Sequence, residues 1–101
     1  MLARYESELK RCISEIVISE VGDPEVGWIT VQSVKLSPDY RRAVVFISVL
    51  GEAEVSLRAL RRASGFIRSS LSRKLPWRSV PKLEFQLEGE ETIDEQGPDL
   101  Q

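Results

Sequence analysis

The stretch that decides the fold runs from Val55 to Leu83 and reads VSLRALRRASGFIRSSLSRKLPWRSVPKL. It contains eight basic residues and no Asp or Glu, although the chain of 101 residues has a formal net charge of −2. Up to Leu75 its apolar side chains recur at the three- and four-residue steps of a helix, and Pro76 ends that pattern. A helix of this length between two strands is a crossover connection, which predicts that the flanking strands are parallel.

The basic residues of this stretch are expected to share one side of the helix. At about 100° per residue, five of the eight fall within an arc of roughly 140°, opposite the apolar stripe. Solvated helix faces usually mix both signs of charge, so a face without acids predicts a polyanionic partner, and the arginine fork suits phosphate oxygens. The residues in this arc are Arg58, Arg61, Arg62, Gly65, Arg68, Ser69, Ser72 and Arg73.

Gly65 stands inside this helical pattern, where glycine costs about 1 kcal/mol relative to alanine. One explanation is close packing of the helix against a sheet; the other is a bend that lets a partner's backbone approach. The position of Gly65 on the basic side favours the second explanation. We expect Phe66 to be a core residue at the bend rather than a base-stacking ring, whereas Trp77 either anchors the next strand or stacks on a base.

An amphipathic helix is predicted over residues 2–20, and Gly22-Asp23-Pro24 ends it. Residues 28–36 and 42–50 are predicted strands, and the tight turn between them makes the pair antiparallel. In the first of these strands the apolar alternation slips by one residue, which predicts a bulge near Gln32-Ser33.

A third strand is predicted over residues 80–88, with apolar residues alternating toward a single buried face. The order is therefore helix, strand, strand, long bent helix, strand. It predicts a two-layer α+β domain over residues 1–88, with a three-stranded mixed sheet and its helices on one face. Residues 89–101 are acidic and are expected to form a disordered tail.

The composition excludes several classes of site. The chain has no histidine and a single cysteine, Cys12, so it cannot form an internal disulfide, a Cys/His zinc site or a histidine-based catalytic triad. Cys12 lies on the apolar side of the first predicted helix, where it is expected to be a buried small hydrophobe. No signal peptide or membrane-spanning run is visible, so a cytoplasmic protein without cofactor or metal is expected.

Several segments together resemble the ribosome-binding factor A family. They are Asp23-Pro24-Glu25-Val26-Gly27, residues 30–39, residues 43–51, residues 60–71 with Ala63-Ser64-Gly65 at their centre, and residues 78–85. Each piece alone is weak, but together they occur in the family's order and spacing. The chain differs from the family's pattern at Glu6, Glu8 and Glu25, where the family is usually more basic.

The resemblance implies a type II KH-like domain in which Ala63-Ser64-Gly65 is an interhelical kink in place of a Gly-x-x-Gly loop. It also implies a non-catalytic assembly factor that binds the small ribosomal subunit and its ribosomal RNA during late maturation, with a role in cold adaptation. We expect the protein to be a monomer. With the basic helix face, the resemblance gives the residues expected to bind RNA, which are Arg58, Arg61, Arg62, Ala63, Ser64, Gly65, Arg68, Ser69, Ser72, Arg73, Lys74 and Arg78.

Two other functions remain open from the residues alone. The basic helix face could dock on an acidic protein, and such binding would survive nuclease treatment. Catalysis is not expected, because the only candidate pairs are Asp39 beside Arg41 or Arg42, and Glu84 beside Lys82, which have the pattern of turn or strand-surface charges.

Overall fold

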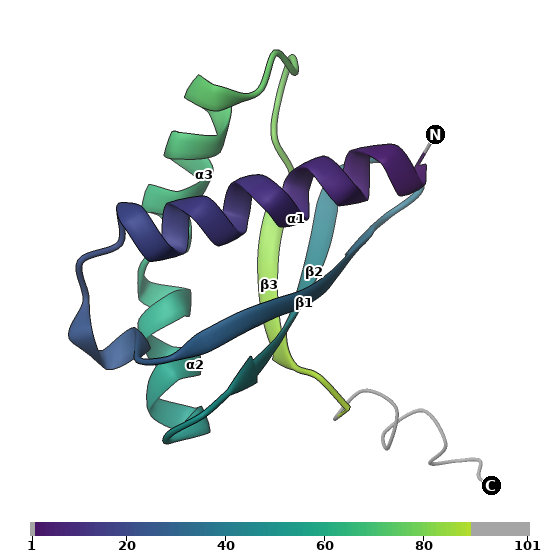
Figure 1. Cartoon of the computed structure of the whole chain (residues 1–101). Coiled ribbons are helices and arrows are strands. Elements are labelled where there is room, and N and C mark those ends of the chain that lie inside the picture. Colours follow the sequence, from purple (N-terminus) through teal and green to yellow (C-terminus); the bar gives the residue numbers. More distant parts are fainter. Residues whose placement is uncertain (1, 90–101) are drawn as a thin grey trace, which may run out of the picture.

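The computed structural model describes residues 2–89, and Figure 1 shows the course of the chain. Helices and strands follow one another in the predicted α-β-β-α-α-β order, with one short 3-10 helix added after the first helix. The elements are α1 (Leu2–Ser19), η1 (Pro24–Val26), β1 (Ile29–Leu36), β2 (Arg42–Val49), α2 (Ala53–Arg62), α3 (Ser64–Lys74) and β3 (Lys82–Leu87).

The three strands form one mixed sheet in the order β1-β2-β3. β1 pairs with β2 antiparallel, and its register shifts between Val31 and Ser33, which confirms the predicted bulge. β2 pairs with β3 in parallel, as the crossover through α2 and α3 predicts. The apolar strand β2 is therefore central, and both β1 and β3 are edge strands.

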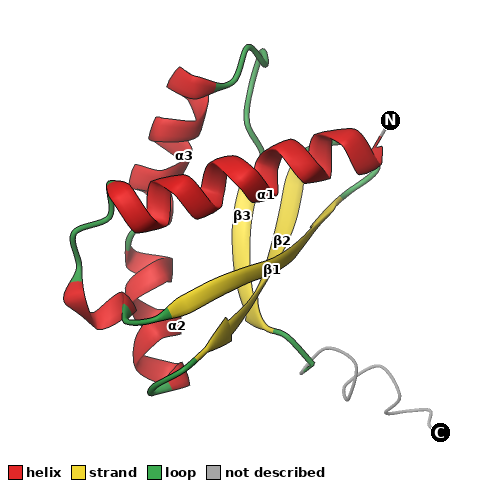
Figure 2. Ribbon diagram, in the orientation of Figure 1, coloured by secondary structure: helices red, strands yellow, loops and turns green. Residues whose placement is uncertain are grey.

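The core lies between one face of this sheet and the helices (Figure 2). Val45 and Ile47 of β2 and Phe85 of β3 are almost wholly buried there, together with Ile13 of α1 and Leu71 of α3. Cys12 is buried as predicted, and this burial raises the pKa of its thiol. The α+β class and the arrangement of helices on one face are confirmed.

The element boundaries differ from the predictions at several ends. The first strand begins at Ile29 rather than Trp28, although the Trp28 carbonyl still accepts from the Leu50 N–H at 3.0 Å. Trp28 is 81% exposed. β3 is shorter than predicted, and except for Gly89 the acidic tail expected over residues 89–101 lies outside the described residues.

Candidate nucleic-acid interface

The bend that Gly65 predicts is centred on Ala63, which separates α2 from α3. Ala63 has φ −86° and ψ −1°, short of full helical geometry, yet hydrogen bonds continue through it. Its N–H donates to the Ala59 carbonyl at 3.0 Å, and its carbonyl accepts from the Ile67 N–H at 2.9 Å. The long predicted helix is therefore two helices joined at a one-residue kink (Figure 1).

Gly65 is the second residue of α3, and it is exposed. A Cβ added there would meet no atom within 4 Å, and its φ is not in the left-handed region. Neither packing within the described residues nor backbone geometry therefore requires glycine here, which removes the close-packing explanation. Phe66 beside it is 47% exposed, so the expectation of a core residue was wrong; the buried face of α3 begins one residue later, at Ile67.

Arg62 is paired with two acids that come from outside its helix. It donates to Asp23 Oδ2 at 2.9 Å and to Glu25 Oε1 at 2.8 Å. These contacts raise the pKa of Arg62, and the Glu25 N–H and Arg62 lower the pKa of Asp23. The η1 segment is held in place because Ser56, buried in α2, donates from its hydroxyl to the Val26 carbonyl at 2.7 Å.

Arg61 reaches across to the edge strand β3, and Arg68 reaches to the loop that leads into it. Arg61 donates to the Phe85 carbonyl at 3.2 Å, and Arg68 donates to the Pro81 and Val80 carbonyls at 3.0 and 3.3 Å. An edge strand presents unpaired carbonyls, and Arg61 of α2 satisfies one of them, while Arg68 of α3 satisfies two carbonyls just before the strand. Their guanidinium groups lie between the helices and the sheet edge rather than standing away from the molecule.

Lys74 takes part in a contact between α1 and α3. Its Nζ lies 2.9 Å from Glu20 Oε2, while the buried Ser70 hydroxyl donates to Glu20 Oε1 at 2.6 Å. The hydrogen bond from Ser70, followed by that from Lys74, lowers the pKa of Glu20. This carboxylate therefore neutralises Lys74, the last residue of α3.

The remaining basic residues of the predicted set have no carboxylate partner among residues 2–89. These are Arg58 in α2, Arg73 in α3 and Arg78 in the following loop, and all three are exposed. Ser69 and Ser72 are also exposed, and their hydrogen bonds stay within α3. The structure thus places the predicted residues on α2, the kink, α3 and the loop after it, but Arg62 and Lys74 are neutralised by acids that the helix sequence alone did not indicate.

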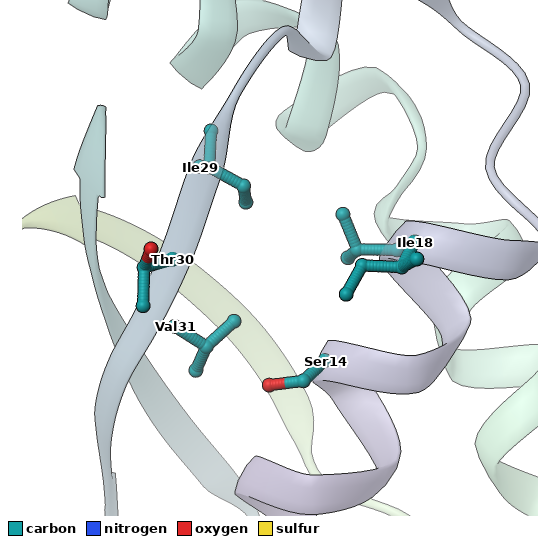
Figure 3. Close-up of a pocket in the computed structure, with 6 residues that line it drawn as sticks. Ser14, Ile18, Ile29, Thr30 and Val31 are labelled. Carbon is teal, nitrogen blue, oxygen red and sulfur yellow. The ribbon is translucent and has the colours of Figure 1, made fainter. Parts of the chain in front are cut away.

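A separate hollow lies on another part of the surface, between α1 and β1. Figure 3 shows Ser14 and Ile18 of α1 opposite Ile29, Thr30 and Val31 of β1. No charged side chain lines it, so it lacks the chemistry to attract a phosphate. Within residues 2–89 no three side chains of the metal-binding acidic, Cys or His types gather into a possible ion site, and no helix is long and apolar enough to cross a membrane.

The family follows from comparison with known proteins. A family model described as Ribosome-binding factor A matches residues 1–96. The chain belongs to the ribosome-binding factor A family. One family member, from Natranaerobius thermophilus, is 49% identical over 88 residues, which are 84% of this chain and 67% of that protein. Another, from a Polaromonas species, is 38% identical over 86 residues, covering 84% of this chain and 70% of its own length.

Solved structures of ribosome-binding factor A share the fold. The crystal structure of the Thermus thermophilus protein superposes with a TM-score of 0.82 at 34% identity, covering 86% of this chain and 94% of that one. A homology model of the Thermus thermophilus protein, fitted into a cryo-EM map of its complex with the 30S subunit, gives a TM-score of 0.73 at 35% identity. That comparison covers 84% of this chain and 92% of the other.

Proposed function

We propose that this chain is an assembly factor that binds the small ribosomal subunit. The observation that carries the proposal is membership of the ribosome-binding factor A family, one of whose members has been fitted into a map of a 30S complex. We propose further that the chain contacts ribosomal RNA directly, acts during late maturation and matters most in the cold.

We infer that the RNA contacts are made by the side of the molecule that holds α2, the kink and α3. Arg58, Arg73 and Arg78 are exposed cations without an internal carboxylate among the described residues, so they can neutralise phosphates at no cost in broken ion pairs. Gly65 leaves open space beside the helix, where an RNA backbone can approach closely. The whole set proposed to bind RNA remains Arg58, Arg61, Arg62, Ala63, Ser64, Gly65, Arg68, Ser69, Ser72, Arg73, Lys74 and Arg78.

The mechanism proposed for this site is docking without a chemical step. Positively charged side chains attract the phosphate backbone and the kink sets how closely it approaches, as in KH modules, which clamp a nucleic-acid backbone at the equivalent loop. Binding by counterion release depends steeply on salt, at about −0.9 in log affinity against log salt for each duplex phosphate neutralised and about −0.7 for a single strand.

The internal contacts decide which substitutions test this proposal cleanly. Reversing Arg62 or Arg68 would also break their bonds to Asp23, Glu25, Val80 and Pro81, so a loss of binding could come from a rearranged fold. A double variant, Arg58→Glu with Arg73→Glu, breaks no ion pair within residues 2–89. Lys10→Glu with Lys35→Glu is its control, because it makes the same charge change at two exposed positions on α1 and β1.

The experiment is co-sedimentation with purified small subunits across a salt series. We expect the Arg58 and Arg73 double variant to lose binding and to have a shallower salt dependence, while the control double variant binds nearly as the parent does. Equal binding by both double variants would overturn the site. Binding that survives nuclease removal of accessible RNA would instead indicate an acidic protein as the partner.

A further inference from the structure

An aromatic pocket lies at the end of the molecule where the turn between β1 and β2 meets the loop after α3. Its volume is about 460 Å³, within the range of about 300–1,000 Å³ typical of small-ligand sites. It is built from α1, the β1–β2 turn and the α3–β3 loop. Its lining residues are Tyr5, Asp39, Tyr40, Arg41, Pro76, Trp77, Arg78 and Ser79.

Three rings meet in this pocket without stacking on one another. The centroid of the Tyr5 ring lies 5.2 Å from that of Tyr40 and 5.0 Å from that of Trp77, at interplanar angles of 67° and 87°. Both contacts are edge-to-face, so neither Tyr40 nor Trp77 has a face covered by a parallel ring of Tyr5. Tyr40 is 41% exposed, and Trp77 is partly buried against the core edge.

The backbone holds Tyr40 in an unusual conformation. Its φ is 65°, and it is the only non-glycine residue with positive φ among residues 2–89. Large side chains rarely adopt this left-handed geometry, and such outliers persist where the surroundings impose them, often at ligand sites. Asp39 fixes the turn by accepting from the Ser37 hydroxyl at 2.7 Å and from the Arg41 N–H at 3.0 Å.

The charges around the rings suit a nucleotide. Arg41 and Arg78 are exposed and have no carboxylate within ion-pair distance among the described residues. Asp39 adds a carboxylate, which Ser37 and the Arg41 N–H keep ionised by lowering its pKa. Arginines bind phosphate oxygens, aromatic faces stack on bases, and a carboxylate accepts hydrogen bonds from base amino groups.

We propose that this pocket binds one unstacked base of single-stranded RNA, against Tyr40 and Trp77, with flanking phosphates on Arg41 and Arg78. That the ligand is RNA rests on the proposed function. The pocket is a second RNA-binding site, in addition to the one on α2, the kink and α3. Arg78 lines the pocket and also belongs to the basic stretch. An RNA strand that crosses α3 can therefore contact basic residues all the way to the pocket. A base inside a duplex cannot expose its face, so the pocket selects single strands.

The test uses the fluorescence of Trp77 in the full chain with Trp28→Phe, which removes the only other tryptophan. Trp28 lies at the opposite end of β1 from the pocket and is exposed, so its loss leaves the pocket intact. The probes are a short single-stranded oligoribonucleotide of mixed sequence and the duplex that it forms with its complement. We expect the single strand to change Trp77 fluorescence, and the duplex to bind, if at all, without that change.

Two substitutions of Tyr40 in the same background distinguish stacking from folding. Tyr40→Gly removes the ring and suits the positive φ, so the chain should keep its melting temperature while its affinity falls on the order of tenfold. Tyr40→Phe keeps the ring and should keep the affinity. Arg41→Ala with Arg78→Ala should make the salt slope shallower by about 1.4, at about 0.7 per single-strand phosphate.

The outcomes separate the two proposals. RNA binding detected by anisotropy without a Trp77 response, or equal affinity of Tyr40→Gly and its parent, overturns the pocket even if co-sedimentation with small subunits depends on Arg58 and Arg73. A Trp77 response that depends on Tyr40 supports the pocket even if reversing Arg58 and Arg73 leaves co-sedimentation unchanged. Failure of any RNA to bind at low salt overturns the pocket.

Discussion

Gly65 lowers the stability of α3, and the reason for a glycine at this position bears on function. The described residues impose neither a steric nor a conformational need for glycine at this position, although a helix is more stable with alanine. A residue that lowers helix stability without an internal reason points to something outside the chain that approaches it. A substitution of Gly65 is therefore a test in which the free energy of unfolding and the affinity for small subunits are expected to change in opposite directions.

We expect Gly65→Ala to raise the free energy of unfolding by about 0.5–1 kcal/mol, because alanine restricts the unfolded chain and favours α3. The same methyl group should weaken binding to small subunits by filling the open space beside the kink. Urea unfolding gives the first quantity and co-sedimentation the second. Gly51→Ala is the control, since its added Cβ also meets nothing but lies before α2, away from the kink. Unweakened binding by Gly65→Ala would mean that no backbone approaches there.

Among the elements, η1 has a role that its length of three residues does not suggest. It places Asp23 and Glu25 on Arg62 and is itself fixed to α2 by Ser56. This pairing removes a cation from the proposed RNA-binding side. While Glu25 holds it, Arg62 is expected to contribute less to RNA binding than a free arginine would.

Glu25→Gln is expected to tighten binding to small subunits, because it removes one of the two carboxylates that neutralise Arg62. The slope of log affinity against log salt should become steeper by up to about 0.9, the value for one further duplex phosphate. Stability should change little, since the Arg62 and Glu25 side chains are 54% and 57% exposed. The matched control is Glu15→Gln, which removes the partner of Arg11 on α1. Equal affinities of the two variants would show that Arg62 makes no phosphate contact.

The contact between α1 and α3 predicts a pH dependence of stability. Ser70 is the largest cause of the lowered pKa of Glu20, and a lowered carboxylate pKa contributes stability above the unfolded pKa and loses it as the pH falls through the folded value. Ser70→Ala should therefore lower the melting temperature at pH 7, and the difference from the parent should shrink below about pH 4.3. Thermal unfolding between pH 7 and pH 3 measures this difference.

Ser72→Ala is the control for that series, because the Ser72 hydroxyl donates only to the Ser69 carbonyl within α3. Its effect on the melting temperature should be small and should not vary with pH. A Ser70→Ala difference that stays constant down to pH 3 would show that Glu20 is not the group responsible.

The elements also show how far the sequence could predict the structure. Apolar periodicity, the tight turn and Pro76 are local signals, and they predicted the element order, the bulge and the parallel pairing. The bend was expected from Gly65 and, at Ala63-Ser64-Gly65, from the family resemblance; the structure has it at Ala63. The partners of Arg62 could not be found in this way, because Asp23 lies 39 residues away and only the folded chain brings it near. The same holds for the rings of Tyr5, Tyr40 and Trp77, which come from three separate segments. Phe66 was misplaced because the bend was expected to turn it inward, whereas the buried residues of α3, Ile67 and Leu71, are those that an unbroken helical pattern already predicts.

At the scale of the whole molecule the charges are strongly segregated. The stretch 55–83 has eight basic residues and no acid, whereas residues 84–101 have seven acids and no basic residue. One of these acids, Glu84, already forms an ion pair within the fold, with Arg42. Five further acidic side chains lie in residues 90–101. Their negative charge can compete with RNA for the basic side. This competition is limited by salt screening, because the Debye length is about 8 Å at physiological salt.

Removal of residues 90–101 raises the formal net charge from −2 to +3 and is therefore expected to tighten RNA binding at low salt. The effect should fade toward 1 M salt, where the Debye length is about 3 Å. A full-length variant with the same five carboxylates changed to amides separates charge from chain length, and it should bind as tightly as the shortened chain. Anisotropy titrations with one single-stranded RNA at several salt concentrations measure both. If neither variant binds more tightly than the parent at low salt, the acidic segment does not compete for the basic side; if only the shortened chain does, the competition is steric rather than electrostatic.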